Sequence, residues 1–293
     1  MAPEDSTTPH RRSPRGRPHP PFATDRDGSM TGVSENARRL HVHTFGNPVG
    51  VPLLALHGVT GHGARWAPLA EAVPELRWIG VDLRGHGRSP WSPPWNIEQH
   101  VADAIAVLDR LEVEDVAVVG HSFGGAIAVH LARAVPDRIE RLVLLDPALG
   151  LDPDDMLETA EDTRPDETYP DLDSARADRA DRWKGVDSAV VDAEVAAHLA
   201  HFEDHWEWRY LRSAALVAWN EMARPAVVPP AGMPTLVLPA TRGDFVEQSW
   251  LDRCAATLGA DLTVRPVEAG HMLFLERTDE VAAHIREFVL GVD

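Results

Sequence analysis

The sequence predicts an α/β protein built on a doubly wound, mostly parallel sheet, and three observations favour this fold class. Short apolar runs of the kind found in strands covered on both faces recur along the chain. Segments with apolar residues at helical spacing separate these runs, so right-handed crossovers between parallel strands are expected. The alternation stops after Pro147 and resumes near residue 235, which indicates an inserted segment.

The regular pattern begins near residue 38. The expected strands cover residues 39–45, 52–56, 78–81, 116–119, 142–145, 235–238 and 262–267. The expected helices between them cover residues 67–72, 97–111, 126–134, 247–258 and 279–289. In the second of these helices, Val101, Ile105 and Leu108 recur at the spacing of one helical face.

The insertion, residues 151–225, shows no pattern of a buried strand and is expected to form a helical cap. Its expected helices cover residues 173–183, 190–205 and 206–222. The segment is acidic and contains Trp183, Trp206, Trp208 and Trp219, four of the nine tryptophans. The core then consists of two parts, residues 36–150 and 226–293, on either side of the insertion.

The first 35 residues differ from the rest. The stretch from Pro3 to Pro21 holds six prolines and four arginines with hardly an apolar residue. Such a segment buries too little surface to offset its ordering entropy, so residues 1–35 are expected to be a disordered tail. No apolar stretch follows the Arg11-Arg12 pair, so no export signal is predicted and a cytoplasmic location is expected. Met30 is an alternative candidate for the start of translation.

Composition narrows the class of partner. The chain has 293 residues, of which 44% are hydrophobic and 25% charged, as in soluble globular proteins. Its formal charge of −18 repels phosphate backbones, which argues against nucleic-acid binding. The one cysteine, Cys254, cannot form an intrachain disulfide. No apolar run is long enough to suggest a membrane span. The expected partner is a small, apolar acyl compound, and the oligomeric state is left open.

The sharpest chemical signal is Gly120-His-Ser-Phe-Gly-Gly125, which follows an expected strand and opens an expected helix. This is the context of a nucleophile elbow, in which Ser122 occupies a strained turn at the carboxyl end of the sheet. Glycines two residues before and after the serine let the strand and helix approach without Cβ clashes. Ser122 is therefore the candidate nucleophile.

A serine nucleophile needs a base, and the base needs an acid that orients it. His271 lies between the last expected strand and the last helix, at the same sheet edge as the elbow, and is the candidate base. Two aspartates compete for the acid, because Asp244 and Asp146 each follow an expected strand. Asp244 is the first choice; Asp146 is expected to hold the loop leading into the insertion.

A tetrahedral oxyanion needs two N–H donors, which are expected from the backbones of Val59 and Phe123. Aromatic and small residues near these loops are candidates for contact with substrate: His57, Gly58, Trp95 and Trp206. For Trp206, packing of the insertion onto the core is an equally good interpretation. His198, His201 and His205 are spaced like residues on one helix surface. No cluster has the ligand spacing of a zinc site, so neither a metal nor a cofactor is expected.

The order of motifs resembles that of the α/β-hydrolase superfamily over residues 38–292. The motifs are His57-Gly58, Asp82-Leu-Arg-Gly-His-Gly-Arg-Ser89, Gly120–Gly125, Gly243-Asp244 and Gly270-His271. The chain looks like the cap-bearing, serine-nucleophile branch with esterases and lipases. The resemblance implies Ser122, Asp244 and His271 as the catalytic triad. It favours acyl transfer over alkyl displacement, because dehalogenases and epoxide hydrolases of this superfamily carry Asp at the position of Ser122.

The expected activity is hydrolysis of a carboxylic ester or related acyl compound through an acyl-enzyme. C–C bond hydrolysis of a ring-fission diketone needs the same triad and stays open. Lactonase and aminopeptidase activities also stay open. A different class also stays open: a hydrolase relative that binds a small ligand and turns it over only incidentally.

Overall fold

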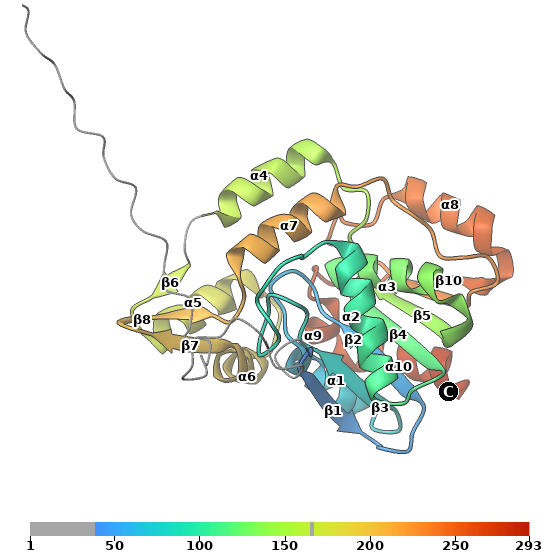
Figure 1. Ribbon diagram of the computed structural model, residues 1–293, viewed down its shortest axis with the longest axis horizontal. Coiled ribbons are helices and arrows are strands. Elements are labelled where there is room, and N and C mark those ends of the chain that lie inside the picture. The colour runs from blue at the N-terminus through green and yellow to red at the C-terminus, as the bar shows by residue number, and fades with distance from the viewer. Residues whose placement is uncertain (1–38, 165–166, 293) are drawn as a thin grey trace, which may run out of the picture. The chain divides into compact units, whose positions relative to one another are not determined.

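The structure, a computed structural model, describes residues 39–164 and 167–292 (Figure 1). The predicted disordered tail, residues 1–35, lies outside these described residues. The main sheet contains strands β1 (Val42–Gly46), β2 (Pro52–Leu56), β3 (Arg77–Val81), β4 (Val116–His121), β5 (Ile139–Leu145), β9 (Thr235–Leu238) and β10 (Leu262–Val264). Their spatial order is β1-β3-β2-β4-β5-β9-β10. β1 runs antiparallel to β3, and every other neighbouring pair is parallel, which confirms the predicted fold class.

Helices connect these strands. They are α1 (Ala67–Ala72), α2 (Ile97–Arg110), α3 (Phe123–Ala134), α8 (Gln248–Leu258), α9 (Leu273–Glu276) and α10 (Thr278–Leu290). Short 3-10 turns occur at Gly63–Trp66, Pro136–Arg138 and Gly259–Asp261. In the described part of the chain, no helix has both the length and the apolar character needed to cross a bilayer.

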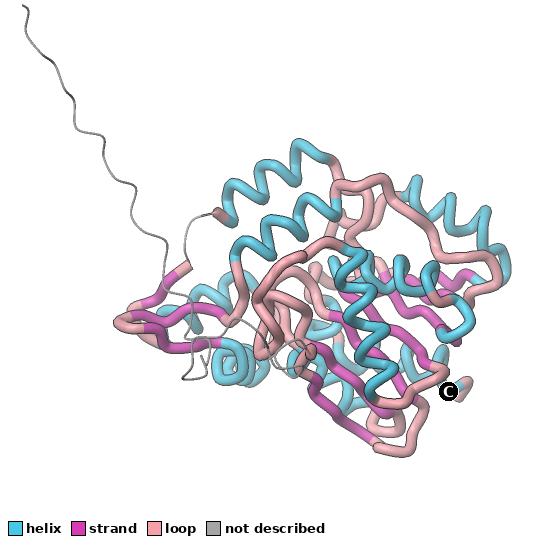
Figure 2. The backbone as a smooth tube through the Cα atoms, in the orientation of Figure 1, coloured by secondary structure: helices cyan, strands magenta, loops and turns pink. Residues whose placement is uncertain are grey.

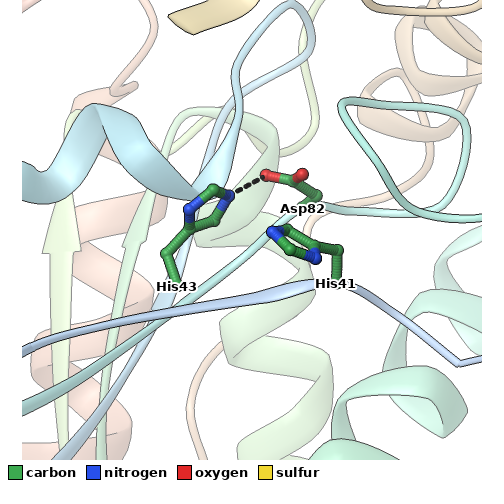
Figure 3. A group of neighbouring side chains, drawn as sticks. All are labelled: His41, His43 and Asp82. Carbon is green, nitrogen blue, oxygen red and sulfur yellow. Dashed lines mark hydrogen bonds and ion pairs between the residues drawn. The ribbon is translucent and has the colours of Figure 1, made fainter.

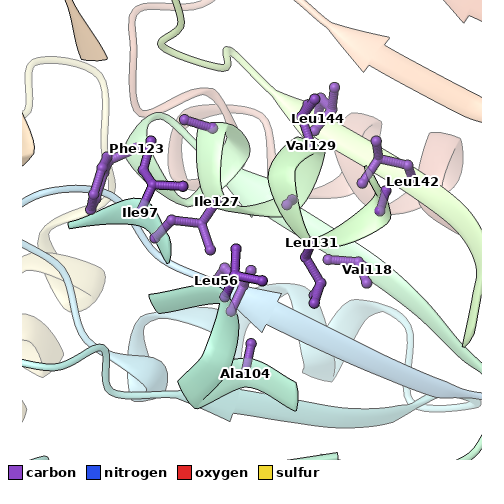
Figure 4. Packing of buried hydrophobic residues seen from close by; sticks show 14 of the residues in the cluster. Leu56, Ile97, Ala104, Val118, Phe123, Ile127, Val129, Leu131, Leu142 and Leu144 are labelled. Carbon is purple, nitrogen blue, oxygen red and sulfur yellow. The ribbon is translucent and has the colours of Figure 1, made fainter. Parts of the chain in front are cut away.

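The core lies on both faces of the sheet. Along β2, Leu54 and Leu56 face the cluster that includes Ile127 of α3 (Figure 4), while Leu53 and Ala55 face the cluster on the other side. That second cluster includes side chains of α1, α9 and α10. These four of the five β2 side chains are fully buried, because successive residues of a strand point to opposite faces and both faces of this sheet are covered. A continuous apolar run is therefore what this position of the chain requires.

The segment between β5 and β9, here called the cap (residues 151–225), contains both helices and strands. Its elements are α4 (Pro153–Thr163), β6 (Thr168–Tyr169), α5 (Leu172–Arg182), α6 (Ser188–His198), β7 (Leu199–Phe202), β8 (His205–Trp208) and α7 (Arg212–Met222). The three strands form an antiparallel sheet in the order β6-β8-β7. Figure 2 shows them apart from the main sheet. The prediction of a wholly helical insertion is therefore wrong.

The error lies between residues 190 and 211, where one helix was expected to run into the next. Instead α6 ends at His198, and a hairpin pairs Leu199 with Trp208, both of which are buried. Glu203 has φ +50° in the tight turn between the strands. Cross-strand packing of these side chains outweighs helical propensity, which is a weak preference. The histidines at 201 and 205 consequently lie on two strands rather than on one helix face.

Candidate active site

Ser122 lies in the turn between β4 and α3, with φ +55° and ψ −122°. Positive φ is uncommon for a residue with a side chain, so the surrounding backbone must impose it. A Cβ at Gly120 would lie 2.3 Å from the carbonyl oxygen of Gly124, and one at Gly124 would lie 2.1 Å from that of Leu56. The glycines thus permit the close crossing of strand and helix, as the sequence predicts. Ser122 is 3% exposed.

The acid beside His271 is Asp146. Its Oδ2 accepts a hydrogen bond from Nδ1 of His271 at 2.7 Å, and its Oδ1 accepts one from the amide of Ala240 at 3.0 Å. Asp146 directly follows β5 and is 1% exposed. The amide of Ala240 belongs to the loop after β9, so Asp146 does not make the expected bond to the loop that leads into the insertion. The first choice, Asp244, is exposed and makes no hydrogen bond or ion pair within the described part of the chain.

The path of the loop after β9 explains this correction. Gly243 lies against the carboxylate, so that a Cβ there would be 3.2 Å from Oδ2 of Asp146. The chain then turns outward at Asp244, and the next side chain, Phe245, stacks on the ring of His271 with 4.1 Å between centroids. Asp146 needs no such loop because it stands at the strand end, with φ +42°. Sequence analysis named both aspartates but ranked them in the wrong order.

His271 follows β10 and is held from several sides. Its carbonyl oxygen accepts a hydrogen bond from Nε2 of His121, the residue before the serine, at 2.8 Å. Because Nδ1 donates to Asp146, Nε2 carries the lone pair that a base needs. Among the described residues, no hydrogen bond joins the hydroxyl of Ser122 to this ring. Such bonds are often long without substrate and tighten in the reacting complex.

Two backbone amides near Ser122 remain free. Phe123 is the first residue of α3, so its N–H has no partner within the helix. Neither this amide nor that of Val59 donates to another described residue. Gly58 lets the Val59 loop approach, since a Cβ there would lie 3.1 Å from Cβ of Ser122. The arrangement suits two donors that converge on an oxyanion.

His57 orients one of these donors, the amide of Val59. Its Nε2 accepts the amide of Leu83 at 2.9 Å, so the proton is on Nδ1, which donates to the carbonyl oxygen of Gly58 at 2.8 Å. The C=O and N–H of a trans peptide point in opposite directions. Holding the carbonyl of Gly58 therefore directs the N–H of Val59 away from His57. Burial, followed by the neighbouring His86, lowers the pKa of His57 well below its usual value, so the ring is neutral. Both nitrogens of His57 have partners within the protein, so the ring positions the loop, and its contact with substrate stays a prediction.

His86 links the same loop to the cap. Its Nε2 lies within hydrogen-bond distance of the carbonyl oxygen of Val59, and its Nδ1 lies 3.1 Å from the carbonyl oxygen of Arg84. On either side of His86, the amide of Gly87 donates to Arg209 at 2.6 Å, and the carbonyl of Gly85 accepts from Leu211 at 2.7 Å. Tyr210, between these two cap residues, stacks on the ring of His86 with 6.2 Å between centroids. The segment around His86 therefore contacts both the cap and the loop that carries Val59.

Asp82, directly after β3, holds the segment that follows β2 and the segment that contains His86 (Figure 3). Its carboxylate accepts hydrogen bonds from the amides of Gly63 at 2.7 Å and Arg88 at 2.9 Å, and from His43 at 3.0 Å. Burial alone would raise the pKa of Asp82, but these bonds hold it below its usual value. With His41, the group offers three possible metal-ligand atoms within 4.8 Å of one another. The hydrogen bonds already account for the buried carboxylate.

The remaining predicted contacts are placed as follows. Gly58 lies against Ser122, as described. Trp95 donates from Nε1 to the carbonyl of Trp91 at 3.2 Å and lies beside Gly85. Trp206 is on β8, where its ring meets that of His201 edge-on at 4.9 Å. Contact of these tryptophans with substrate stays a prediction. Sequence reasoning missed Phe245, whose only signal was its place beside Asp244.

Comparisons with known proteins identify the family to which this fold belongs. Residues 51–278 match the family model described as "alpha/beta hydrolase fold". Lipase LipV of Mycobacterium tuberculosis is 41% identical over 251 residues, covering 84% of this chain and 96% of the relative. A 2-hydroxymuconate semialdehyde hydrolase of Pseudomonas sp. is 40% identical over 116 residues, covering 38% of this chain and 40% of the relative. Among solved structures, E-2-(acetamidomethylene)succinate hydrolase superposes with a TM-score of 0.74 at 20% identity, covering 85% of this chain and 94% of that one. The chain belongs to the α/β-hydrolase fold family.

Proposed function

We propose that this protein is a serine hydrolase that cleaves carboxylic esters, with Ser122, His271 and Asp146 as its triad. The observation that carries the proposal is the bond from His271 to the buried Asp146, beside a serine held at φ +55°. That bond fixes the tautomer in which Nε2 of His271 can accept a proton. The free amides of Val59 and Phe123 supply the complementary charge.

In the first step, the Ser122 hydroxyl attacks the ester carbonyl while His271 takes its proton. The charge that develops on the carbonyl oxygen is stabilised by the two amides, which need no reorganisation as the reaction proceeds. Asp146 stabilises the imidazolium and keeps its orientation. His271 then gives the proton to the leaving alcohol, and the acyl group remains on Ser122.

In the second step, water attacks the acyl-enzyme. His271 again takes a proton and returns it to Ser122, so that the acid is released and the free enzyme restored. Every step uses groups of this chain and water. The small-molecule partner is thus an ester, whose acyl pocket is expected between the cap and the sheet edge.

Similarity supports ester cleavage over C–C cleavage. The match to the lipase extends over nearly its whole length and therefore includes the cap, which shapes the substrate pocket in this kind of fold. The match to the semialdehyde hydrolase covers less than half of either chain. Fold alone does not fix the reaction, since one fold carries many chemistries.

The test combines labelling with turnover. We expect a fluorophosphonate probe to label the protein at Ser122 and short 4-nitrophenyl esters to be turned over. Ser122→Ala should abolish both with an unchanged melting curve, whereas Ser249→Ala, at an exposed serine on α8, should change neither. Labelling without turnover of any ester would favour a ligand-binding relative. Faster cleavage of a ring-fission diketone, a lactone or an aminoacyl arylamide than of every ester would replace the ester assignment.

A further inference from the structure

Two buried polar side chains of the cap have no role in the reaction described above. Arg179 on α5 is 6% exposed, and His198 at the end of α6 is 1% exposed. Both lie in the layer where the cap meets the core. Buried polar groups are nearly always hydrogen-bonded, so each exception calls for an explanation.

Arg179 is surrounded by aromatic rings rather than by acceptors. Its guanidinium carbon lies 4.0 Å from the ring centroid of Trp208 and 5.0 Å from that of Trp183. These contacts attract the charge but accept none of the five N–H groups in their plane. Its Nε is buried without any hydrogen-bond partner.

His198 is equally unpaired. Both of its ring nitrogens are buried without a partner. The ring is stacked with that of His62 at 4.4 Å between centroids and, on a wider spacing of 6.5 Å, with Tyr210. Within the described chain, six buried side-chain nitrogens lack a partner, and these two residues hold three of them.

The two carboxylates whose charges act on Arg179, those of Glu194 and Glu167, are already bonded to other groups. Glu194 accepts from Arg65 and, at 2.8 Å, from His62. Glu167 is paired with Arg182 at 2.7 Å and accepts the hydroxyl of Tyr210 at 3.3 Å. Among residues 39–164 and 167–292, therefore, no carboxylate is hydrogen-bonded or ion-paired to Arg179, although the charges of Glu194 and Glu167 act on it from farther away. A buried arginine without an anion is costly, which suggests that a ligand provides one.

The cluster adjoins the reaction site through Tyr210. The Tyr210 ring is stacked on the ring of His198 and on the ring of His86. His86 is in turn in hydrogen-bond contact with the carbonyl oxygen of Val59. The row of rings thus leads from the proposed oxyanion loop to Arg179.

We propose that Arg179 and His198 bind an anionic oxygen group, a carboxylate, of the ester substrate. The guanidinium fork donates two N–H groups to the two oxygens, and His198 donates one more from its ring. Trp208 and Trp183 exclude water and strengthen these bonds. The inference rests on the proposed ester hydrolysis and narrows its substrate to anionic esters.

The test compares two matched esters, 4-nitrophenyl hydrogen adipate and 4-nitrophenyl hexanoate, which differ by one terminal carboxylate. In the wild type we expect the higher kcat/KM for the adipate. Arg179→Gln should lower the ratio of kcat/KM for adipate over hexanoate by about tenfold to a hundredfold, as expected for a charge-assisted hydrogen bond. His198→Phe keeps the stacked ring but removes both nitrogens, and should lower the same ratio by about tenfold.

Arg176→Gln is the matched control, since this arginine lies on the same helix but is partly exposed and ion-paired with Asp192. It should leave the ratio unchanged. An unchanged ratio in both Arg179→Gln and His198→Phe, with either variant folded, would overturn the proposal. Equal loss on the two esters would show a merely structural role and overturn it as well. A phosphonate-terminated ester of the same length, preferred over the adipate, would identify phosphate as the natural group.

A second measurement separates this proposal from the proposed function. Adipate itself, added to the Ser122→Ala protein, should raise its melting temperature, and Arg179→Gln should remove that shift. If no ester is cleaved but adipate still stabilises the protein through Arg179, ester hydrolysis fails while the anion site stands. If esters are cleaved but adipate neither binds nor is preferred, the anion site alone fails.

Discussion

The sheet edge and the cap are held in place by different kinds of interaction. At the edge, backbone geometry decides: Ser122 and Asp146 follow adjacent parallel strands directly, and glycines allow the crossing beside them. In the cap, side chains decide: Glu194 bonds Arg65 and His62 of the core, and no strand of the main sheet enters. Local backbone geometry thus sets the positions of Ser122 and Asp146, whereas polar side-chain pairs between distant segments hold the cap on the core.

The largest expected effect tests the edge. Asp146→Asn should lower kcat on a short ester by about 10³- to 10⁴-fold, because the amide favours the wrong tautomer of His271. The matched variant, Asp244→Asn, changes an exposed aspartate on the neighbouring loop and should stay within about twofold of the wild type. Steady-state kinetics on purified proteins measure both. A larger loss for Asp244→Asn would restore the acid that the sequence favoured.

How far the sequence could predict the molecule follows the same division. The position of Ser122 was predictable because glycines two residues before and after it are required by contacts within the turn. The choice between Asp146 and Asp244 was not, because both follow neighbouring strands and only the outward path after Gly243 separates them. That path depends on Phe245 meeting His271, a contact between distant segments.

The cap shows the same limit at a larger scale. Its hairpin lies between two helices in a stretch where helical spacing alone suggested continuous helix. Pairing of Leu199 with Trp208 decides the outcome, and it depends on the buried surface that α5 and α6 provide around it. The links through His57 and His86 were equally hidden, since a histidine's partner cannot be read from its spacing.

The next effect tests the cap. Glu194→Gln leaves Arg65 buried with a weaker partner, and should lower the free energy of unfolding by about 3 kcal/mol at pH 7. Glu158→Gln, at an exposed position on α4, is the control and should cost less than about 0.5 kcal/mol. Urea denaturation, together with limited proteolysis of the cap, measures the difference. Equal stability of the two variants would contradict the comparison between edge and cap.

The difference in the free energy of unfolding between wild type and Glu194→Gln should depend on pH in a defined direction. Burial would raise the pKa of Glu194, but Arg65 and His62 hold it well below the usual value. A depressed folded pKa contributes stability that is complete above the unfolded pKa of about 4.3 and is lost as the pH falls through the folded pKa. The gap between wild type and Glu194→Gln should therefore be complete from pH 7 to pH 8 and narrow in strong acid, where the carboxylate of Glu194 is protonated. A gap that does not narrow even in strong acid would mean that the charge of this carboxylate is not what stabilises the fold.

The smallest expected effect concerns His86, where the two regions meet. His86→Leu removes the ring that contacts the carbonyl oxygens of Val59 and Arg84, and should lower kcat by about tenfold, the worth of one buried hydrogen bond, with KM within about threefold. His86→Gln retains an N–H at the end of its side chain and should recover most of the rate. The decisive readout is inhibition by a trifluoromethyl ketone, whose adduct with Ser122 places an oxyanion between the two amides. If His86 orients the loop, the leucine variant loses affinity for the ketone in the same proportion as kcat and the glutamine variant does not. If His86 only supports the cap, both variants should have a lower melting temperature. Their affinity for the ketone should then change only as much as KM for the substrate, because a loosened cap does not act on the oxyanion specifically.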